Sequence, residues 1–147
     1  MKLRILRLPH ARDLALPTYA TNGSAGLDLL AAVDGDIVLP PMERVAVPCG
    51  IAVAMSDNYE AQIRPRSGLA LNHGITLLNA PGTIDSDYRG EVKAILVNLS
   101  TQPFTISRGM KVAQMVIARL KQADVEEVEE LPATSRGEGG FGSTGLV

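Results

Sequence analysis

The sequence predicts an all-β protein, in which short strands form a sandwich, a jelly roll or a barrel. No long stretch of the 147 residues keeps the helical period of apolar residues. Many short runs rich in β-forming residues are instead separated by Gly, Pro, Asn or Asp. Apolar residues make up 46% of the chain, which is enough for a buried core and excludes disorder over most of its length.

Ten segments are expected to be strands, at a spacing typical of sandwiches and barrels. They are Lys2–Leu8, Leu27–Ala32, Asp36–Leu39, Arg44–Pro48, Ile51–Met55, Tyr59–Arg64, Ile75–Leu78, Glu91–Leu99, Phe104–Ile106 and Val112–Leu120. One short helix is expected at Ser67–Asn72, with Ser67 as its N-cap and Gly74 just past its end.

Two of these segments, Glu91–Leu99 and Val112–Leu120, carry apolar residues on both faces. A strand with one face in water alternates more cleanly between apolar and polar residues. We therefore expect the core of a small barrel to cover one face and a second subunit to cover the other.

The end of the chain changes in character, which divides it into a β domain at 1–131 and a mobile arm at 132–147. Five of the ten residues from Arg136 to Gly145 are glycine, and such a segment holds no regular structure on its own. A dinucleotide fingerprint is excluded because no βαβ unit follows, and a phosphate loop is excluded because Ser143 occupies the lysine position.

Phe141 argues against a merely disordered end, because the chain has only two Phe, three Tyr and no Trp. A ring among flexible glycines is better explained if it closes over a flat ligand. Arg136, Ser143 and Thr144 of the same arm would then contact phosphates.

Charge and cysteine content narrow the class of protein. The 14 basic and 16 acidic residues nearly balance, which argues against a nucleic-acid partner. Cys49 is the single cysteine, so an intrachain disulfide and a cysteine-based zinc site are excluded, and a reducing cytoplasm is the expected location. No segment has the length and apolarity of a signal peptide or a membrane span. His10 and His73 lack metal-ligand spacing.

Four further stretches have both a structural and a functional interpretation. Pro65–Ala70 forms either a capped turn or an anion site at a helix start, where Arg66 and Ser67 add donors. Gly82–Gly90 is either a solvated hairpin loop or the site of a carboxylate that takes a proton from water, with an aromatic ring beside it. In Ala25–Leu29, Asp28 needs a partner or a metal to offset desolvation. In Arg108–Gln114, a buried Gln114 would need hydrogen-bond partners.

With the Gly-rich arm, these stretches resemble the five ordered motifs of the trimeric dUTP diphosphatase family, and they span residues 25–145. The resemblance implies a distorted jelly-roll β-barrel. It implies a homotrimer whose three active sites lie between subunits, with the arm of one subunit over a site built by others. The implied reaction is hydrolysis of dUTP to dUMP and pyrophosphate with Mg²⁺.

The resemblance also implies a role for each matching residue. Asp85 would activate the attacking water, and Asp28 would hold Mg²⁺ through water. Tyr88 would lie against the deoxyribose and Asn79 would bind uracil. The phosphates would be bound by Arg66, Ser67, Gly68 and Gln114. In the arm, Phe141 would stack on uracil, while Arg136, Ser143 and Thr144 would bind the outer phosphates.

Two other functions compete with this interpretation. A dCTP deaminase shares the implied fold, but it is expected to carry a glutamate as its base and to lack the Phe-bearing arm. A non-catalytic jelly-roll module for protein binding would not need the full set of acids, arginines and arm residues.

Overall fold

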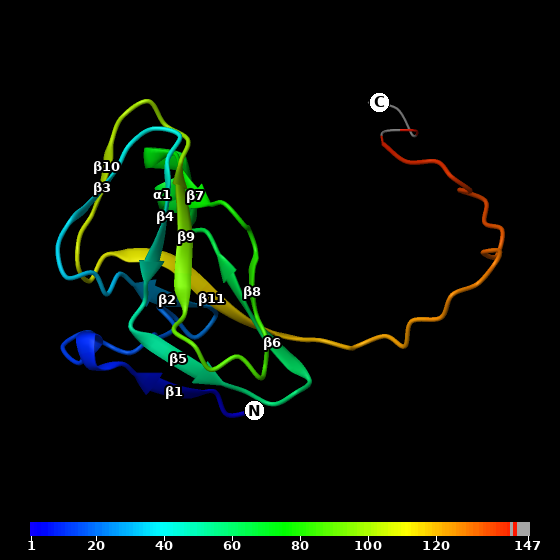
Figure 1. Cartoon of the computed structure of the whole chain (residues 1–147), viewed down its shortest axis with the longest axis horizontal. Helices are drawn as coiled ribbons and strands as arrows, with labels where there is room; N and C mark the ends of the chain where they lie inside the picture. Colours follow the sequence, from blue (N-terminus) through cyan, green and yellow to red (C-terminus); the bar gives the residue numbers. More distant parts are fainter. Residues whose placement is uncertain (142, 144–147) are drawn as a thin grey trace.

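The computed structural model describes residues 1–141 and 143 of the chain, which form a strand-rich barrel followed by an extended C-terminal segment (Figure 1). The strands are β1 Arg4–Arg7, β2 Gly26–Leu30, β3 Ile37–Leu39, β4 Arg44–Pro48, β5 Ile51–Ala54, β6 Tyr59–Arg64, β7 Ile75–Leu77, β8 Gly82–Ile84, β9 Lys93–Asn98, β10 Phe104–Ile106 and β11 Lys111–Arg119. The helical segments are the 3-10 helix η1 Pro9–Ala11 and the α-helix α1 Ser67–His73. The predicted all-β class with one short α-helix is confirmed.

Strands that pair in space are mostly far apart in the sequence. The largest sheet has the order β2-β11-β6-β8, a second has the order β4-β9-β7, and β1-β5 and β10-β3 form two-stranded sheets. All of these pairs are antiparallel. Long antiparallel connections of this kind are typical of a jelly roll. They place β2 and β11, from opposite ends of the barrel sequence, side by side.

The core lies between the sheets and is made of aliphatic side chains. Leu29, Leu96 and Met115 are among its fully buried residues. Asn98 is the buried polar side chain of the described residues, and its amide group is fully partnered. It donates to the carbonyl oxygens of Leu39 and Gln102 at 2.9 and 2.8 Å, so its burial leaves no unpaired polar atom.

The N-cap residue of α1 lies one position earlier than the sequence predicted. Arg66 occupies the N-cap position with an extended backbone, and no side chain caps the first turn. The prediction of Ser67 as N-cap is therefore wrong, because Ser67 already has helical geometry as the first residue of α1. The helix ends at His73, one residue beyond the predicted Asn72. Gly74 lies just past the end as predicted, with a left-handed conformation of φ 64° and an N–H that bonds back to the helix.

The structure differs from the sequence prediction in one strand, β8, and in how the faces of β9 and β11 are covered. Gly82–Ile84 is a strand, β8, that pairs with β6, whereas the sequence suggested a loop there. On β9 the chain itself buries residues of both faces, Leu96 and Val97, so those apolar residues do not require a second subunit. On β11 one face is buried in the core, but Gln114 and Val116 on the other face are only half-buried.

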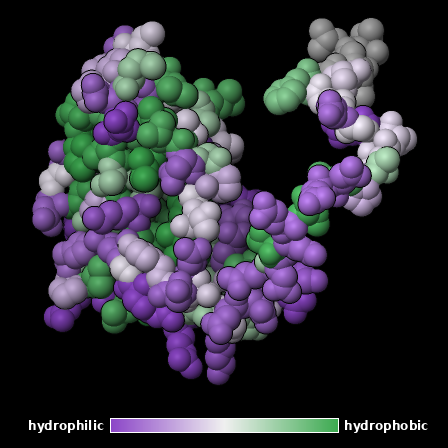
Figure 2. All heavy atoms as spheres, turned by 45° about the vertical axis from the view of Figure 1, so that its right-hand side comes forward, coloured by the Kyte–Doolittle hydropathy of each residue, from purple (hydrophilic) through white to green (hydrophobic). Residues whose placement is uncertain are grey.

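Beyond β11, which ends at Arg119, the chain leaves the barrel and extends away from it (Figure 1). Residues 121–138 are all exposed, and Figure 2 shows this segment as largely hydrophilic. Among the described residues, no helix has the length and apolar character to cross a membrane.

Candidate active site

A cavity of about 300 Å³ opens beside β8 and β9 and collects three of the predicted site residues. Asn79, Asp85 and Tyr88 line it, together with Ala46, Ile63, Gly82, Thr83, Ile84, Glu91, Lys93 and Ile95. The lining thus combines aliphatic side chains with an amide, a phenol and charged groups. We call it the nucleoside pocket. Asp85 and Tyr88 are exposed, so in the single chain the pocket is open to water on this side.

The loop after β8 holds Asp85 and Tyr88 in a compact turn. The Tyr88 N–H donates to the Asp85 carbonyl at 3.1 Å. The Tyr88 hydroxyl donates to the Glu91 carbonyl at 3.2 Å, across Gly90. A Cβ at Gly90 would overlap Tyr88 Oη, so glycine is required for the ring to fold back over the turn. Arg89 closes the loop by donating to the Ser86 carbonyl at 2.6 Å.

Asn79 is placed by its neighbour Gly82 at the start of β8. A Cβ at Gly82 would lie 3.2 Å from Asn79 Nδ2, closer than side chains normally allow. Gly82 is fixed opposite Ile63 by the pairing of β8 with β6. The strand that the sequence did not predict therefore supports one edge of the nucleoside pocket.

A second group of polar residues gathers at one end of the β2-β11-β6 sheet, and we call it the cationic cluster. Asp28 of β2 lies directly opposite Gln114 of β11. The Asp28 carboxylate pairs with Lys111 Nζ at 2.7 Å and with Arg66 Nε at 3.3 Å. Two cations against one carboxylate leave a positive surplus. Arg66 is also anchored by donating to the Lys111 carbonyl at 3.1 Å.

The Gln114 side chain is held near the start of α1 by a hydrogen bond to the main chain. Its Nε2 donates to the Pro65 carbonyl at 2.9 Å, which satisfies the predicted need for a partner. Gly26 of β2 provides the space, because a Cβ there would overlap Gln114 Oε1. Gln114 is half-buried rather than buried as predicted, since it lies on the outward face of β11.

The structure does not bring the predicted residues into one group within a single chain. Arg66, Ser67, Gly68, Gln114 and Asp28 do not line the nucleoside pocket. The described part of the arm, 132–141 and 143, lies apart from both groups: Phe141 is fully exposed, and the Arg136 guanidinium donates to the Gly139 carbonyl at 2.8 Å. Ser143 is exposed as well. Thr144 lies outside the described residues.

Comparison with known proteins decides the family. A sequence model of dUTPase matches residues 12–145. The chain belongs to the dUTPase family. Two curated relatives named deoxyuridine 5′-triphosphate nucleotidohydrolase are similar over nearly their whole length. The protein of Anaplasma marginale (strain St. Maries) is 59% identical and covers 99% of both chains. That of Caldanaerobacter subterraneus subsp. tengcongensis is 56% identical and covers 98% of this chain and 97% of the relative. The predicted family and enzyme class, dUTP diphosphatase, are confirmed.

Solved structures of dUTPases confirm the jelly-roll fold. A dUTPase of Staphylococcus bacteriophage 80alpha with dUpNHpp has a TM-score of 0.89 at 22% identity, over 99% of each chain. The dUTPase of phage phi11 of S. aureus, described with a structural Mg(II) ion, has a TM-score of 0.78 at 21% identity, over 88% of this chain and 98% of that one. At these identities the likeness concerns the fold alone.

The residues of this dUTPase-family chain are compatible with Mg²⁺ bound through substrate rather than in a protein cage. Among the described residues, no group of three His, Cys, Asp or Glu side chains is placed to hold a metal. Both Asp28 oxygens already contact cations, but a carboxylate offers about four acceptor positions. Asp28 therefore retains capacity to accept hydrogen bonds from metal-bound water, the usual state of protein-bound Mg²⁺.

Sequence reasoning missed two residues that the structure places at these groups. Lys111 lies within Arg108–Gln114 and contacts Asp28, which its charge alone did not reveal. Glu91 lines the nucleoside pocket and accepts a hydrogen bond from the Gly50 N–H at 2.9 Å. Its position directly after the Gly82–Gly90 stretch was the available signal.

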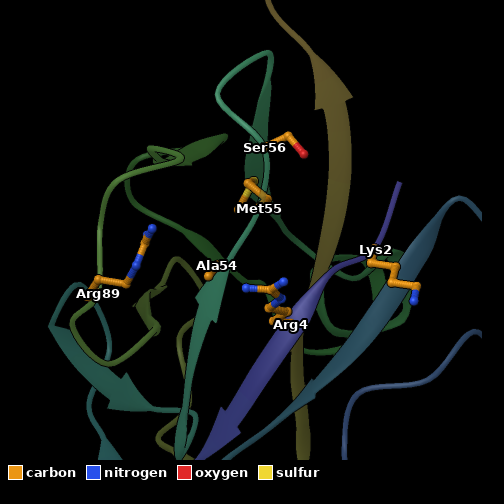
Figure 3. A pocket seen from close by; sticks show the side chains of 6 residues that line it. All are labelled: Lys2, Arg4, Ala54, Met55, Ser56 and Arg89. Atoms are coloured by element: carbon orange, nitrogen blue, oxygen red, sulfur yellow. The ribbon is translucent and has the colours of Figure 1, made fainter.

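A second cavity of the dUTPase-family barrel is basic and shares no lining residue with the nucleoside pocket. It has a volume of about 290 Å³ and is lined by Lys2, Arg4, Ala54, Met55, Ser56 and Arg89. Arg4 comes from β1 and Arg89 from the loop before β9 (Figure 3). Among the described residues, none of the three cations has a carboxylate within ion-pair distance, so the cavity is attractive to an acidic group.

Proposed function

We propose that the chain hydrolyses dUTP to dUMP and pyrophosphate, which keeps uracil out of DNA and supplies dUMP for dTMP synthesis. One observation carries the proposal beyond family membership: Asn79, Asp85 and Tyr88 line a single cavity together with aliphatic side chains. These side chains offer an amide for a base edge, a flat ring for a sugar and a carboxylate for water. A concave site that combines apolar walls with polar groups able to orient a ligand is typical of small-ligand sites.

Asp85 acts as the general base in this proposal. It takes a proton from water while the water oxygen bonds to the α-phosphorus. The bond from that phosphorus to the bridging oxygen breaks, and pyrophosphate leaves. Asp85 is exposed, and a general base works best where bulk water is excluded. The arm is the proposed cover, with Phe141 stacking on uracil while Arg136, Ser143 and Thr144 bind the outer phosphates.

Tyr88 and Asn79 select the nucleoside. The Tyr88 ring, fixed through its hydroxyl to the Glu91 carbonyl, is proposed to lie against C2′ of the sugar and to leave no space for a hydroxyl group. The Asn79 amide has both donor and acceptor groups, as an imide edge such as that of uracil requires. Sugar and base selectivity would thus come from neighbouring segments on either side of β8.

The cationic cluster is proposed to bind the phosphates through Arg66, Ser67, Gly68 and Gln114, with Lys111 beside them. Gly68 supports this, because a Cβ there would meet nothing within 4 Å in the chain itself. Packing within one chain does not require glycine at 68, whereas close approach of a ligand would. Asp28 would hold Mg²⁺ through water, and the ion would supply neutralisation of phosphate charge.

We further propose a homotrimer in which subunits share the active sites. The nucleoside pocket and the cationic cluster do not share lining residues in one chain, and the described part of the arm extends away from both. Charge supports contact between chains as well. The exposed segment 124–130 carries five carboxylates, while the basic cavity of Lys2, Arg4 and Arg89 has no acidic partner among the described residues.

The decisive experiment measures pyrophosphate release with Mg²⁺ from dUTP, UTP, dTTP and dCTP. We expect release from dUTP alone. Asp85→Asn keeps the shape and loses the base, so turnover falls by about 10²- to 10⁴-fold while nucleotide binding persists. Ammonia release from dCTP would instead identify a deaminase. Tight dUTP binding without turnover would identify a non-catalytic module.

Shared sites are tested by mixing two inactive variants. One carries Asp85→Asn, and the other is truncated before Arg136. After subunit exchange, some trimers would pair an intact Asp85 with an intact arm from another chain, so activity rises above both parents. A monomer by light scattering, or no rise despite verified exchange, would reject the shared site.

A further inference from the structure

His10 connects the N-terminal segment to the nucleoside pocket, although its sequence context suggested no role. Its Nε2 lies 2.9 Å from Glu91 Oε1. A carboxylate only accepts hydrogen bonds, so the imidazole is the donor. The Glu91 side chain is 19% exposed and the His10 side chain 37%, so the contact lies at the surface with its acceptor partly shielded from water.

Glu91 forms part of the wall between two cavities. It lines the nucleoside pocket on one side, and on the other a cavity of about 480 Å³ that His10 also lines. The same Oε1 accepts the Gly50 N–H at 2.9 Å. The position of the Glu91 side chain is therefore determined by two donors, the His10 ring and the Gly50 backbone.

The Glu91 main chain holds Tyr88 in turn. The Tyr88 hydroxyl donates to the Glu91 carbonyl at 3.2 Å, and the ring lies so close to Gly90 that no Cβ is accommodated there. A small shift of the backbone at 90–91 would therefore move the ring. Tyr88 lies at the rim of the nucleoside pocket, where such a shift changes the space beside the sugar.

His10 itself is held rigidly by its backbone. The Arg108 guanidinium donates to the His10 carbonyl at 2.6 Å and forms two hydrogen bonds with Asp13, at 2.6 and 3.0 Å. The Leu8 N–H donates to the Gly50 carbonyl at 2.8 Å. These contacts fix the backbone of His10 beside Glu91, so the imidazole needs only its own side-chain rotamer to reach the carboxylate.

From this chain of contacts we propose that His10 is a positioning residue for sugar selectivity. It fixes Glu91, and Glu91 fixes the Tyr88 ring against the deoxyribose. The proposal rests on the proposed function, in which Tyr88 excludes a 2′-hydroxyl group. His10 does not line the nucleoside pocket, so it acts through Glu91 and Tyr88.

The test compares His10→Phe, which keeps a ring and removes the donor, with His10→Gln, which keeps a donor. The measured quantity is the ratio of kcat/KM for dUTP to kcat/KM for UTP. We expect His10→Phe to lower this ratio by about 3- to 10-fold, and His10→Gln to stay within about twofold of the parent. His73→Phe is the matched control, because His73 packs on Phe104 away from the pocket and should leave the ratio unchanged.

A readout independent of activity is amide hydrogen exchange of residues 88–92, which should be faster in His10→Phe than in the parent. If the phenyl ring prevents folding, His10→Ala removes the imidazole without adding volume and should show the same two changes. An unchanged ratio together with unchanged exchange overturns the proposal. If the parent releases no pyrophosphate from dUTP, the proposed function fails, and the exchange of 88–92 still decides whether His10 positions Tyr88.

Discussion

Replacing Gly26 by alanine tests whether the cationic cluster is built as the structure indicates. A Cβ at Gly26 would overlap Gln114 Oε1 and lie 3.1 Å from Gln114 Cβ and Cδ. Gln114 would have to turn away, and its 2.9 Å hydrogen bond to the Pro65 carbonyl would be lost. Overpacking of this kind costs about 1–3 kcal/mol, and we expect the lower half of that range because Gln114 is half-buried and can move.

The prediction becomes specific in a double-mutant cycle with Gln114→Ala. Once the glutamine side chain is shortened, the atoms that overlap the new methyl group at 26 are mostly gone. Gly26→Ala should then be neutral, or stabilising by up to about 1 kcal/mol, because alanine restricts the unfolded chain more than glycine does. The same substitution should therefore destabilise the parent and not the Gln114→Ala variant.

Denaturant unfolding of the four proteins measures the cycle, and the KM for dUTP is measured beside it. For a chain of this size, about 1 kcal/mol corresponds to a shift of roughly 2–4 °C in Tm. Gly23→Ala is the control, because a Cβ there meets nothing within 4 Å. Equal destabilisation by Gly26→Ala in both backgrounds would refute the steric reasoning.

Three further predictions follow from particular positions. Gly68→Ala should leave the fold as stable as the parent, because a Cβ at Gly68 has open space, but it should raise the KM for dUTP. An unchanged KM in steady-state assays would remove Gly68 from the phosphate site. Phe141→Ala should leave Tm unchanged, because the ring is fully exposed. It should slow turnover by about 5- to 150-fold, which corresponds to the free energy of one stacking contact. Equal turnover would reject the closing arm. Burial raises the pKa of the Cys49 thiol to about 12, above its unfolded value. The contribution of this thiol to the free energy of unfolding is therefore complete below about pH 9 and is lost as pH rises toward 12. Unfolding of Cys49→Ala across this range should therefore show a weaker decline than the parent, and parallel declines would contradict the effect of burial.

The order of motifs determined the family before any geometry was known. Asp28, Asp85 and Phe141 stand in short stretches whose order and spacing are read directly from the sequence. The all-β class was predictable too, because short β-rich runs between turn residues leave no room for long helices. The role of Gly74 at the end of α1 was predicted correctly for the same local reason, since Gly74 can adopt the left-handed conformation that ends a helix.

Only the tertiary structure decided which residues meet. Strand pairing placed Asp28 opposite Gln114. Close packing placed the Gln114 side chain against Gly26, which is distant in sequence, and folded the Tyr88 ring back onto Gly90. Lys111 and His10 became candidates through their contacts with Asp28 and Glu91, and the contact between His10 and Glu91 spans 81 positions of sequence. Sequence patterns report local conformation and the face of a strand, whereas register and long-range contacts depend on how the sheets close around one core.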